Sequence, residues 1–413
     1  MLKLFDFQNK ILRDTEGLNR VAYYLDMGLG KTFVASEKVK KLNSELTLIV
    51  CQKSKIDDWM EHFKEHYPTY QVTRLKTNIA MLPTSGVMVI NYESVWRIPE
   101  LLTLRKFTLV LDESQYIAHD TSKRTKFIMK LKPGAVILLS GTPTGGKYED
   151  LYTQARLLGW NITKREYFDR YIITKELKIN RFPIKKVVGY KNTDDLKNQL
   201  RTNGAVFLKT EEAHDLPPQT IIPVHVDATK DYKTFRKDRI ITVRGTTWIG
   251  DGTLTQLLYS RKLCGNFNKN KMSALEDLIE SSQDRLVIFY NFQDEYDDIR
   301  ALLRKLKRPV ATVNGKINDL TNYETCNNSV TLVQYQAGSA GINLQKSNTI
   351  IYFTPPPSST HFEQSKKRTH RIGQDRPCIY YELIVRGSVE EKIYNALAAR
   401  KDYTDELFRG DFT

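Results

Sequence analysis

Short apolar runs that alternate with helical patterns recur twice along this 413-residue chain, and no other feature constrains its fold as strongly. The runs are short, rich in β-branched residues and flanked by polar residues, as strands buried on both faces are. The first set lies at residues 21–25, 46–51, 87–90, 109–111 and 135–139, and the second at 286–290, 330–333, 350–353 and 379–385. This alternation predicts an α/β fold with two parallel-sheet lobes.

The pattern changes over residues 147–255, which are rich in Lys, Arg and Tyr and show little strand signal before residue 220. We therefore expect a first lobe at residues 1–146, a mostly helical insert and linker at 147–255, and a second lobe at 256–413. A helix is expected from Val389, since Ser388 and Glu391 are spaced as a capping box. The aromatic and basic residues of the insert are typical of nucleic-acid binding, and equally of a solvated helical surface.

The formal net charge of +15 favours a polyanionic partner, although an even spread of lysines also keeps a protein soluble. No run of 18 apolar residues occurs, so we expect no membrane association. The first residues lack the apolar core of a signal peptide. The four cysteines are scattered, which favours a reducing compartment. We expect the cytoplasm of a bacterium or phage-infected cell, or the nucleus of a eukaryote.

The Gly-Leu-Gly-Lys-Thr motif at residues 28–32 follows an apolar run and precedes an amphipathic pattern, as a phosphate-binding loop does. Gly28 and Gly30 would let backbone N–H groups approach phosphate oxygens at a helix N-terminus. Lys31 would reach the β- and γ-phosphates of ATP, and the Thr32 hydroxyl would bind Mg²⁺. The alternative is a glycine turn that binds no ligand.

Asp112 and Glu113 follow the apolar run at residues 109–111. Asp112 would hold Mg²⁺, and Glu113 would orient and activate the attacking water. Alone, Asp112 could equally be a helix N-cap. A small polar loop, Ser-Gly-Thr-Pro at residues 140–143, follows the next run and could sense the γ-phosphate. Without its place in the series it is an ordinary turn.

Two arginines near the far end of the chain, Arg368 and Arg371, are three residues apart and would share one face of a helix. The planar guanidinium group suits neutralisation of charge on a γ-phosphate, so these residues suggest a second lobe that closes on the nucleotide. The alternative is pairing with acids on a surface helix. Gln8, upstream of the phosphate loop, has an amide that could read the adenine edge.

Taken in order, these motifs resemble helicase superfamily two. The forms Asp-Met-Gly-Leu-Gly-Lys-Thr at 26–32, Gly-x-x-Gly-Ile-Asn-Leu at 338–344 and Arg-x-x-Arg-Ile-Gly-Gln at 368–374 are similar to its Swi/Snf-type branch. The resemblance covers nearly the whole chain. It implies two RecA-like lobes that bind ATP between them, with Gly341 at the nucleotide, and double-stranded DNA across both. The resemblance also implies DNA contacts at Lys53, Ser54, Asn91, Tyr92, Thr142, Gln336 and Ser339.

We therefore expect an ATP hydrolase with Lys31, Asp112, Glu113, Arg368 and Arg371 as its catalytic residues and ATP and Mg²⁺ as its cofactors. It would be a DNA-stimulated translocase on duplex DNA, acting in replication, recombination or repair. It would work as a monomer that a protein partner could recruit. A strand-separating DNA or RNA helicase is the alternative, because the core motifs do not distinguish duplex from single strand.

Several positions depart from the branch. Ser114 and Gln115 stand where Ala-His is usual, Val206 and Phe207 replace an arginine pair, and residues 354–359 replace a stretch that usually contains Trp-Asn-Pro. The large insertions of chromatin remodellers are absent. The chain is therefore similar to compact phage or bacterial members rather than to nucleosome remodellers.

Overall fold

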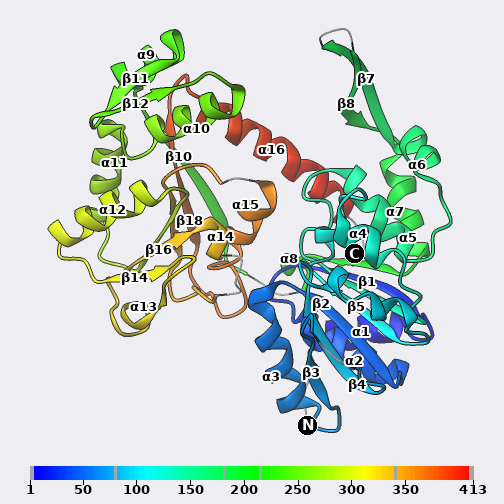
Figure 1. Cartoon of the computed structure of the whole chain (residues 1–413). Helices are drawn as coiled ribbons and strands as arrows, with labels where there is room; N and C mark the ends of the chain where they lie inside the picture. Colours follow the sequence, from blue (N-terminus) through cyan, green and yellow to red (C-terminus); the bar gives the residue numbers. More distant parts are fainter. Residues whose placement is uncertain are drawn as a thin grey trace. The chain divides into compact units, whose positions relative to one another are not determined.

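The computed structural model describes residues 4–78, 81–179, 182–213, 216–338, 342–356 and 358–408. The chain forms two compact units. One comprises Met1–His214 with Lys401–Thr413, and the other comprises Asp215–Arg400. Each unit has its own sheet, as expected for two α/β lobes (Figure 1).

The sheet of the first unit has seven strands in the order β3-β4-β2-β5-β6-β1-β9, and every pair is parallel. Its strands are β1 (Arg20–Leu25), β2 (Leu46–Cys51), β3 (Val72–Arg74), β4 (Gly86–Asn91), β5 (Thr108–Asp112), β6 (Ala135–Leu139) and β9 (Ala205–Leu208). All five predicted runs are strands. The two edge strands, β3 and β9, were not predicted from the sequence.

Helices cover both faces of this sheet because side chains alternate along each strand. Tyr23 of β1 packs in a core with α1, α2 and α3, whereas its neighbour Tyr24 packs in a second core with α5, α6 and α7. The helices are α1 (Asp6–Asp14), α2 (Lys31–Leu42), α3 (Ile56–His66), α4 (Lys123–Ile128), α5 (Tyr152–Leu157), α6 (Lys164–Tyr171), α7 (Thr193–Thr202) and α8 (Thr210–Ala213).

Residues 147–255 were predicted to form an insert and linker between the lobes, but in the structure they are divided between the two units. Leu151, Leu196 and Phe207 belong to the apolar core of the first unit, and β9 pairs with β1. The region is also less helical than expected, because β7 (Ile172–Ile179) and β8 (Phe182–Tyr190) form an antiparallel hairpin. Its later part belongs to the second unit. The chain therefore divides near residue 214 and not at residues 146 and 255.

The second sheet has the order β10-β18-β17-β13-β16-β14-β15, in which only β14 and β15 are antiparallel. Its strands are β10 (Gln219–Val226), β13 (Leu286–Tyr290), β14 (Val310–Val313), β15 (Asn318–Asp319), β16 (Val330–Gln334), β17 (Thr349–Tyr352) and β18 (Cys378–Val385). The four runs predicted for the second lobe are β13, β16, β17 and β18.

The helices of this unit are α9 (Lys230–Asp238), α10 (Thr253–Cys264), α11 (Lys269–Glu280), α12 (Gln293–Lys305), α13 (Thr321–Thr325), α14 (Tyr335–Gly338), α15 (Ser359–Lys366) and α16 (Val389–Phe408). A small hairpin of β11 (Ile240–Val243) and β12 (Thr246–Ile249) lies between α9 and α10 in the sequence. The start of α16 confirms the helix predicted from Val389. Both units are α/β sheets covered by helices and are parallel apart from β14 and β15, as expected for two α/β lobes. Within the described ranges, no helix has the length and apolar content needed to cross a bilayer.

Candidate nucleotide site and nucleic-acid interface

The predicted nucleotide-site residues of the first unit gather at the carboxyl edge of its sheet. β1, β6 and β5 are neighbours, and Leu139 is level with Tyr23 on one side and with Asp112 on the other. The loops that follow these strands therefore start at the same edge. In parallel α/β sheets this edge is where ligands bind.

The loop after β1 has the backbone form that a phosphate site requires. Gly28 and Gly30 have φ angles of 90° and 71°, a region that only glycine adopts readily, and α2 begins at Lys31. Lys31 Nζ donates to the carbonyl oxygens of Leu25 at 2.9 Å and Asp26 at 3.2 Å. The ammonium group is thus held beside the helix N-terminus, where a phosphate would bind.

Gln8 of α1 packs directly against this loop. Its Nε2 donates to Leu29 O at 3.0 Å, and its Oε1 accepts from Phe5 N at 3.0 Å. A Cβ atom at Gly30 would lie 2.4 Å from Gln8 Nε2, so the glycine is required for this contact as well. Recognition of adenine by Gln8 stays a prediction.

The acidic pair lies at the end of β5, in a largely buried setting. Asp112 Oδ2 accepts from Trp59 Nε1 at 2.9 Å, and Tyr92 Oη donates to the backbone oxygen of Asp112 at 2.9 Å. Burial, and then the neighbouring Glu113 carboxylate, raise the pKa of Asp112 to about 6. A divalent cation here would offset the repulsion between the two acids, so this donor set fits Mg²⁺.

A hydrogen-bond chain that the sequence did not reveal links the two polar loops. Glu113 adopts a left-handed backbone with φ of 55°, and its Oε2 accepts from Gln115 Nε2 at 2.7 Å. Gln115 Oε1 in turn accepts from Ser140 Oγ at 2.7 Å, and Ser140 Oγ accepts from Thr142 N at 2.9 Å. The Gln115 amide therefore couples the carboxylate of Glu113 to the Ser-Gly-Thr-Pro loop.

Three of the residues predicted to contact DNA line one surface groove of about 880 Å³ in the first unit. Lys53 and Ser54 follow β2, and Asn91 ends β4. Arg74 and Arg97 also line the groove, together with Glu93 and with Asp57, which pairs with Arg74 at 3.2 Å. Polar walls with exposed basic groups such as Lys53 and Arg97 suit a sugar–phosphate backbone. We refer to this feature as the β2–β4 groove.

The other predicted contacts are less accessible or lie elsewhere. The Tyr92 side chain is fully buried and stacks on Tyr116, so we no longer place it among the DNA-contacting residues. Thr142 is 6% exposed. In the second unit Gln336 is exposed, whereas Ser339 and Gly341 lie outside the described residues.

The two arginines of the second unit do not lie on a helix, contrary to the prediction. α15 ends at Lys366, and the chain turns through Arg368 and Arg371. Gln374 shapes this turn, because its Nε2 donates to Gln345 O at 3.1 Å, Ser347 O at 3.0 Å and Thr369 O at 3.3 Å. The hydrogen bonds to these three carbonyl groups stabilise a turn here instead of a continued helix.

Within the turn, the two guanidinium groups differ in setting. Arg368 is buried, and its backbone oxygen accepts from Leu344 N at 3.0 Å. Arg371 Nη1 donates to Asn343 Oδ1, and burial lowers the pKa of Arg371. His370 is also buried, and its Nε2 lies 2.8 Å from Pro217 O. The turn is therefore built onto the loop that follows α14 and the segment before β10.

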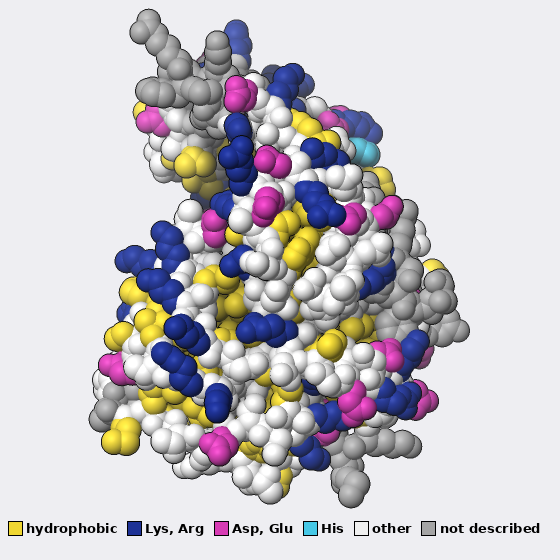
Figure 2. Space-filling model, turned by 90° about the vertical axis from the view of Figure 1, so that its right-hand side faces the viewer, with side chains coloured by type: hydrophobic (Ala, Val, Ile, Leu, Met, Phe, Trp, Pro, Cys, Tyr) yellow, Lys and Arg dark blue, Asp and Glu magenta, His cyan; other side chains and the backbone are white. Residues whose placement is uncertain are grey.

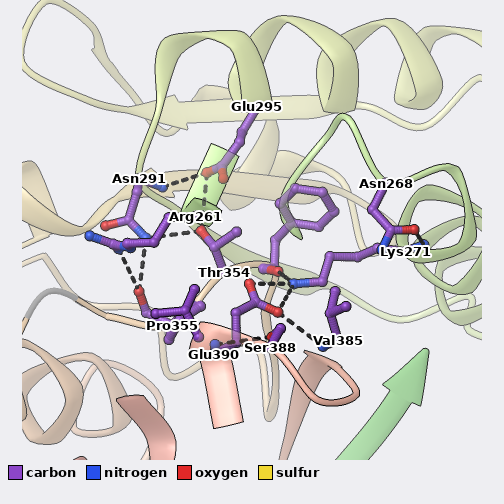
Figure 3. Close-up of polar contacts among 12 residues, drawn as sticks. Arg261, Asn268, Lys271, Asn291, Glu295, Thr354, Pro355, Val385, Ser388 and Glu390 are labelled. Carbon is purple, nitrogen blue, oxygen red and sulfur yellow. Dashed lines mark hydrogen bonds and ion pairs between the residues drawn. The ribbon is translucent and has the colours of Figure 1, made fainter. Parts of the chain in front are cut away.

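The loop between β17 and α15 is held by side chains from α10, from α12 and from the loop that precedes α12 (Figure 3). Asn291 Nδ2 donates to Thr354 Oγ1 and to Pro355 O, both at 2.9 Å, and Arg261 Nη2 donates to Pro355 O at 3.1 Å. Glu295 Oε2 accepts from Thr354 Oγ1 at 3.1 Å. The sequence of this segment departs from the Swi/Snf-type pattern, and these hydrogen bonds fix its path.

Glu295 itself is a fully buried carboxyl group. Its Oε2 accepts from the backbone N–H groups of Asn291 at 2.8 Å and Phe292 at 3.1 Å, whereas its Oε1 has no partner among the described residues. A Cβ at Gly265 would lie 2.5 Å from Oε1, so Gly265 leaves just enough room for it. Burial raises the pKa of Glu295 to about 7.

A raised pKa means that the folded state favours the protonated form of Glu295. Its stabilising contribution is therefore complete below the unfolded pKa of about 4.3 and is lost as the pH rises through about 7. We expect Glu295→Gln to remove this pH-dependent loss of stability, because the amide does not ionise. The difference in unfolding free energy between variant and wild type should grow in favour of the variant from pH 5 to pH 8, as measured by urea unfolding. A difference that stays constant with pH would contradict the assignment.

Two models of known protein families match most of this chain. The SNF2-related domain matches residues 25–269, and the helicase conserved C-terminal domain matches residues 270–373. An ATP-dependent helicase of Mycoplasma pneumoniae, described as uncharacterized, is 23% identical over 94% of this chain and 40% of its own length.

Two animal relatives are described as SWI/SNF-related matrix-associated actin-dependent regulators of chromatin, subfamily A-like protein 1. The Drosophila melanogaster protein is 24% identical over 92% of this chain and 53% of its own length. The Caenorhabditis elegans homolog is 22% identical over 98% and 62%. The chain thus spans about half the length of these relatives. The solved Sulfolobus solfataricus SWI2/SNF2 ATPase core in complex with dsDNA is 22% identical over 100% of this chain and 94% of that chain, with a TM-score of 0.48.

Proposed function

Because the chain belongs to the SNF2-related family, whose domain matches residues 25–269, we propose that it is an ATP-driven translocase on duplex DNA. The observation that carries this proposal is the chain from Glu113 through Gln115 and Ser140 to Thr142. These hydrogen bonds connect the Glu113 carboxylate, which is suited to activate water, with the Ser-Gly-Thr-Pro loop that follows β6. A translocase needs such a connection, because ATP hydrolysis must change its affinity for DNA.

In this proposal the first unit binds ATP at the carboxyl edge of its sheet. Backbone N–H groups at the start of α2 and the Lys31 ammonium group hold the phosphates. Gln8 stabilises the loop through its hydrogen bond to Leu29 O. Glu113 accepts a proton from the attacking water. Mg²⁺ held by Thr32 and Asp112 would neutralise phosphate charge when bound.

Arg368 and Arg371 supply positive charge from the second unit. We propose that they stabilise the γ-phosphoryl group during transfer, so that hydrolysis depends on both units. Their turn is preorganised by Gln374, which limits the reorganisation needed at that step. The helicase conserved C-terminal domain, which covers the turn, supports this assignment.

The track is proposed to be double-stranded DNA, held in part in the β2–β4 groove. The net charge of +15 supports a nucleic-acid partner, and Figure 2 shows several Lys and Arg side chains gathered along one edge of the face in view. The bacterial relative supports a cytoplasmic location, and replication, recombination or repair are the processes in which we place the motor.

The test is the steady-state ATPase rate without nucleic acid and with duplex DNA, single-stranded DNA or RNA, at one fixed salt concentration. We expect duplex DNA to stimulate turnover most strongly, and longer duplexes to stimulate it more. Stimulation by single strands or RNA alone would replace this proposal with a strand-separating helicase. No turnover with any nucleic acid would contradict both.

Removing the Gln115 amide should uncouple the two polar loops. Gln115→Ala loses one hydrogen bond to a carboxylate and one to a hydroxyl, so we expect kcat to fall about 10- to 100-fold. ATP affinity should stay unchanged, because Gln115 contacts neither the phosphate loop nor Gln8. Gln115→His retains a donor and an acceptor and should recover much of the rate. Wild-type kcat in Gln115→Ala would refute the role of the chain.

A further inference from the structure

A dense group of basic side chains lies on the first unit outside the predicted nucleotide and DNA motifs. Residues 121–134 hold five basic residues and no acidic one. Of these, Lys123, Lys126, Lys130 and Lys132 are exposed. α4 packs against the short helix η2 (Val95–Arg97), which adds the exposed Arg97. We call Arg97, Lys123, Arg124, Lys126, Lys130 and Lys132 the α4 surface.

Few basic residues of the α4 surface have an acidic partner. Some basic residues elsewhere in the first unit do pair with acids, as in Lys55–Asp58 at 2.6 Å, Lys164–Asp120 at 2.6 Å and Arg170–Asp195 at 2.9 Å. On the α4 surface only Arg124 has such a partner within the described part of the chain, namely Glu93 at 3.8 Å. The surface therefore presents uncompensated positive charge.

Local stability does not account for this arrangement. Lys123 and Arg124 occupy the first turn of α4, where the helix dipole favours acidic residues, and that turn contains no acid. Lys126 follows Lys123 by three residues on this short helix, and like charges at this spacing repel. The arrangement costs the isolated fold stability, which an anionic partner would offset.

The α4 surface continues directly from the β2–β4 groove. Arg97 and Tyr116 both line the groove, and the Arg124 guanidinium group lies over the Tyr116 ring at 5.3 Å. Arg97 and Lys123 lie over the Trp96 ring at 5.1 and 5.0 Å, which holds their positive groups at the junction. Basic side chains thus continue from the groove, which also holds Asp57 and Glu93, onto α4.

We propose that the α4 surface is a second phosphate-binding surface, which grips duplex DNA beyond the stretch held in the β2–β4 groove. The inference rests on the proposed duplex partner and adds a contact that none of the sequence motifs supplies. Lysines contact phosphates without reading bases, so this contact would be independent of sequence. This contact would increase the length of duplex that the protein binds. It would also retain the DNA while other DNA contacts change during ATP turnover.

The test is the equilibrium binding of Lys126→Glu/Lys130→Glu to short and long duplexes, of about 10 and about 30 base pairs, or roughly one and three helical turns. Since each lysine lost removes one phosphate contact, the slope of log K against log salt on the long duplex should fall by about 1.8. Binding to the short duplex should match wild type. Lys126→Gln/Lys130→Gln should lower the slope equally, which separates lost contacts from added repulsion.

The matched control is Lys230→Glu/Lys233→Glu on α9 of the second unit, which changes the net charge by the same amount at two exposed positions. It should retain the wild-type slope. An α4-surface variant that binds the long duplex like wild type, or no more weakly than the control, would overturn the inference. So would equal losses on both duplexes. Binding is measured without ATP turnover, so absent ATPase stimulation would count against the proposed function alone.

Discussion

Glu113→Gln is expected to bind ATP as tightly as wild type and to hydrolyse it about 10²- to 10⁴-fold more slowly, because the amide cannot accept a proton from water. The side chain keeps its size, and its oxygen can still accept from Gln115 Nε2. Nucleotide affinity should be measured by fluorescent-nucleotide titration, and kcat with saturating duplex DNA.

The control for this substitution is Glu61→Gln, the same chemical change at an exposed position of α3. It should leave kcat unchanged. If Glu113→Gln turned over at the wild-type rate, Glu113 would not be the base, and the assignment of the site would be wrong. A loss of ATP binding in this variant would instead indicate a structural role for the carboxylate.

The second large effect is expected on stability. Lys271 and Glu390 form an ion pair in which both side chains are fully buried, with Nζ 2.7 Å from each carboxylate oxygen. Lys271 Nζ also donates to Phe353 O at 2.9 Å (Figure 3). Lys271→Met leaves Glu390 as an uncompensated buried charge and should cost about 3–5 kcal/mol. The Tm of the second unit should fall by roughly 10 °C.

A double variant distinguishes the loss of the ion pair from the cost of leaving the Glu390 carboxylate buried without a partner. Lys271→Met/Glu390→Leu removes both charges and should recover most of the Tm, because apolar replacements of buried pairs are often neutral. Acid should also partly rescue the single variant, since protonation removes the charge of Glu390. Equal Tm values for wild type and Lys271→Met at neutral pH would contradict the account of this pair.

The inner strands of both sheets could be predicted from the sequence because they are buried on both faces. Residues 46–51, 135–139 and 286–290 are predominantly apolar runs and are strands with the same bounds in the structure. The edge strands β3 and β9 have only three and four residues, so local pattern did not reveal them. β9 is also defined by its pairing with β1, far away in the sequence.

Contacts between side chains distant in the chain account for what the sequence missed. The sequence showed Gln115 only as a departure from the Swi/Snf-type pattern, and its hydrogen bond from Ser140 Oγ at 2.7 Å appears only in the structure. The arginine spacing favoured a helix, but Gln374 stabilises a turn through three carbonyl groups that local propensity does not include. Tyr92 was grouped with Asn91 by sequence position, although Asn91 lines the β2–β4 groove and the Tyr92 side chain is fully buried.

The central claim is that ATP hydrolysis moves this protein along duplex DNA. Displacement of a third strand from a DNA triplex tests it most directly, since a motor on the duplex removes that strand as it passes. We expect displacement that requires ATP, is lost in Glu113→Gln, and occurs without separation of the strands of a forked duplex. Duplex-stimulated hydrolysis without any displacement of the third strand would contradict translocation.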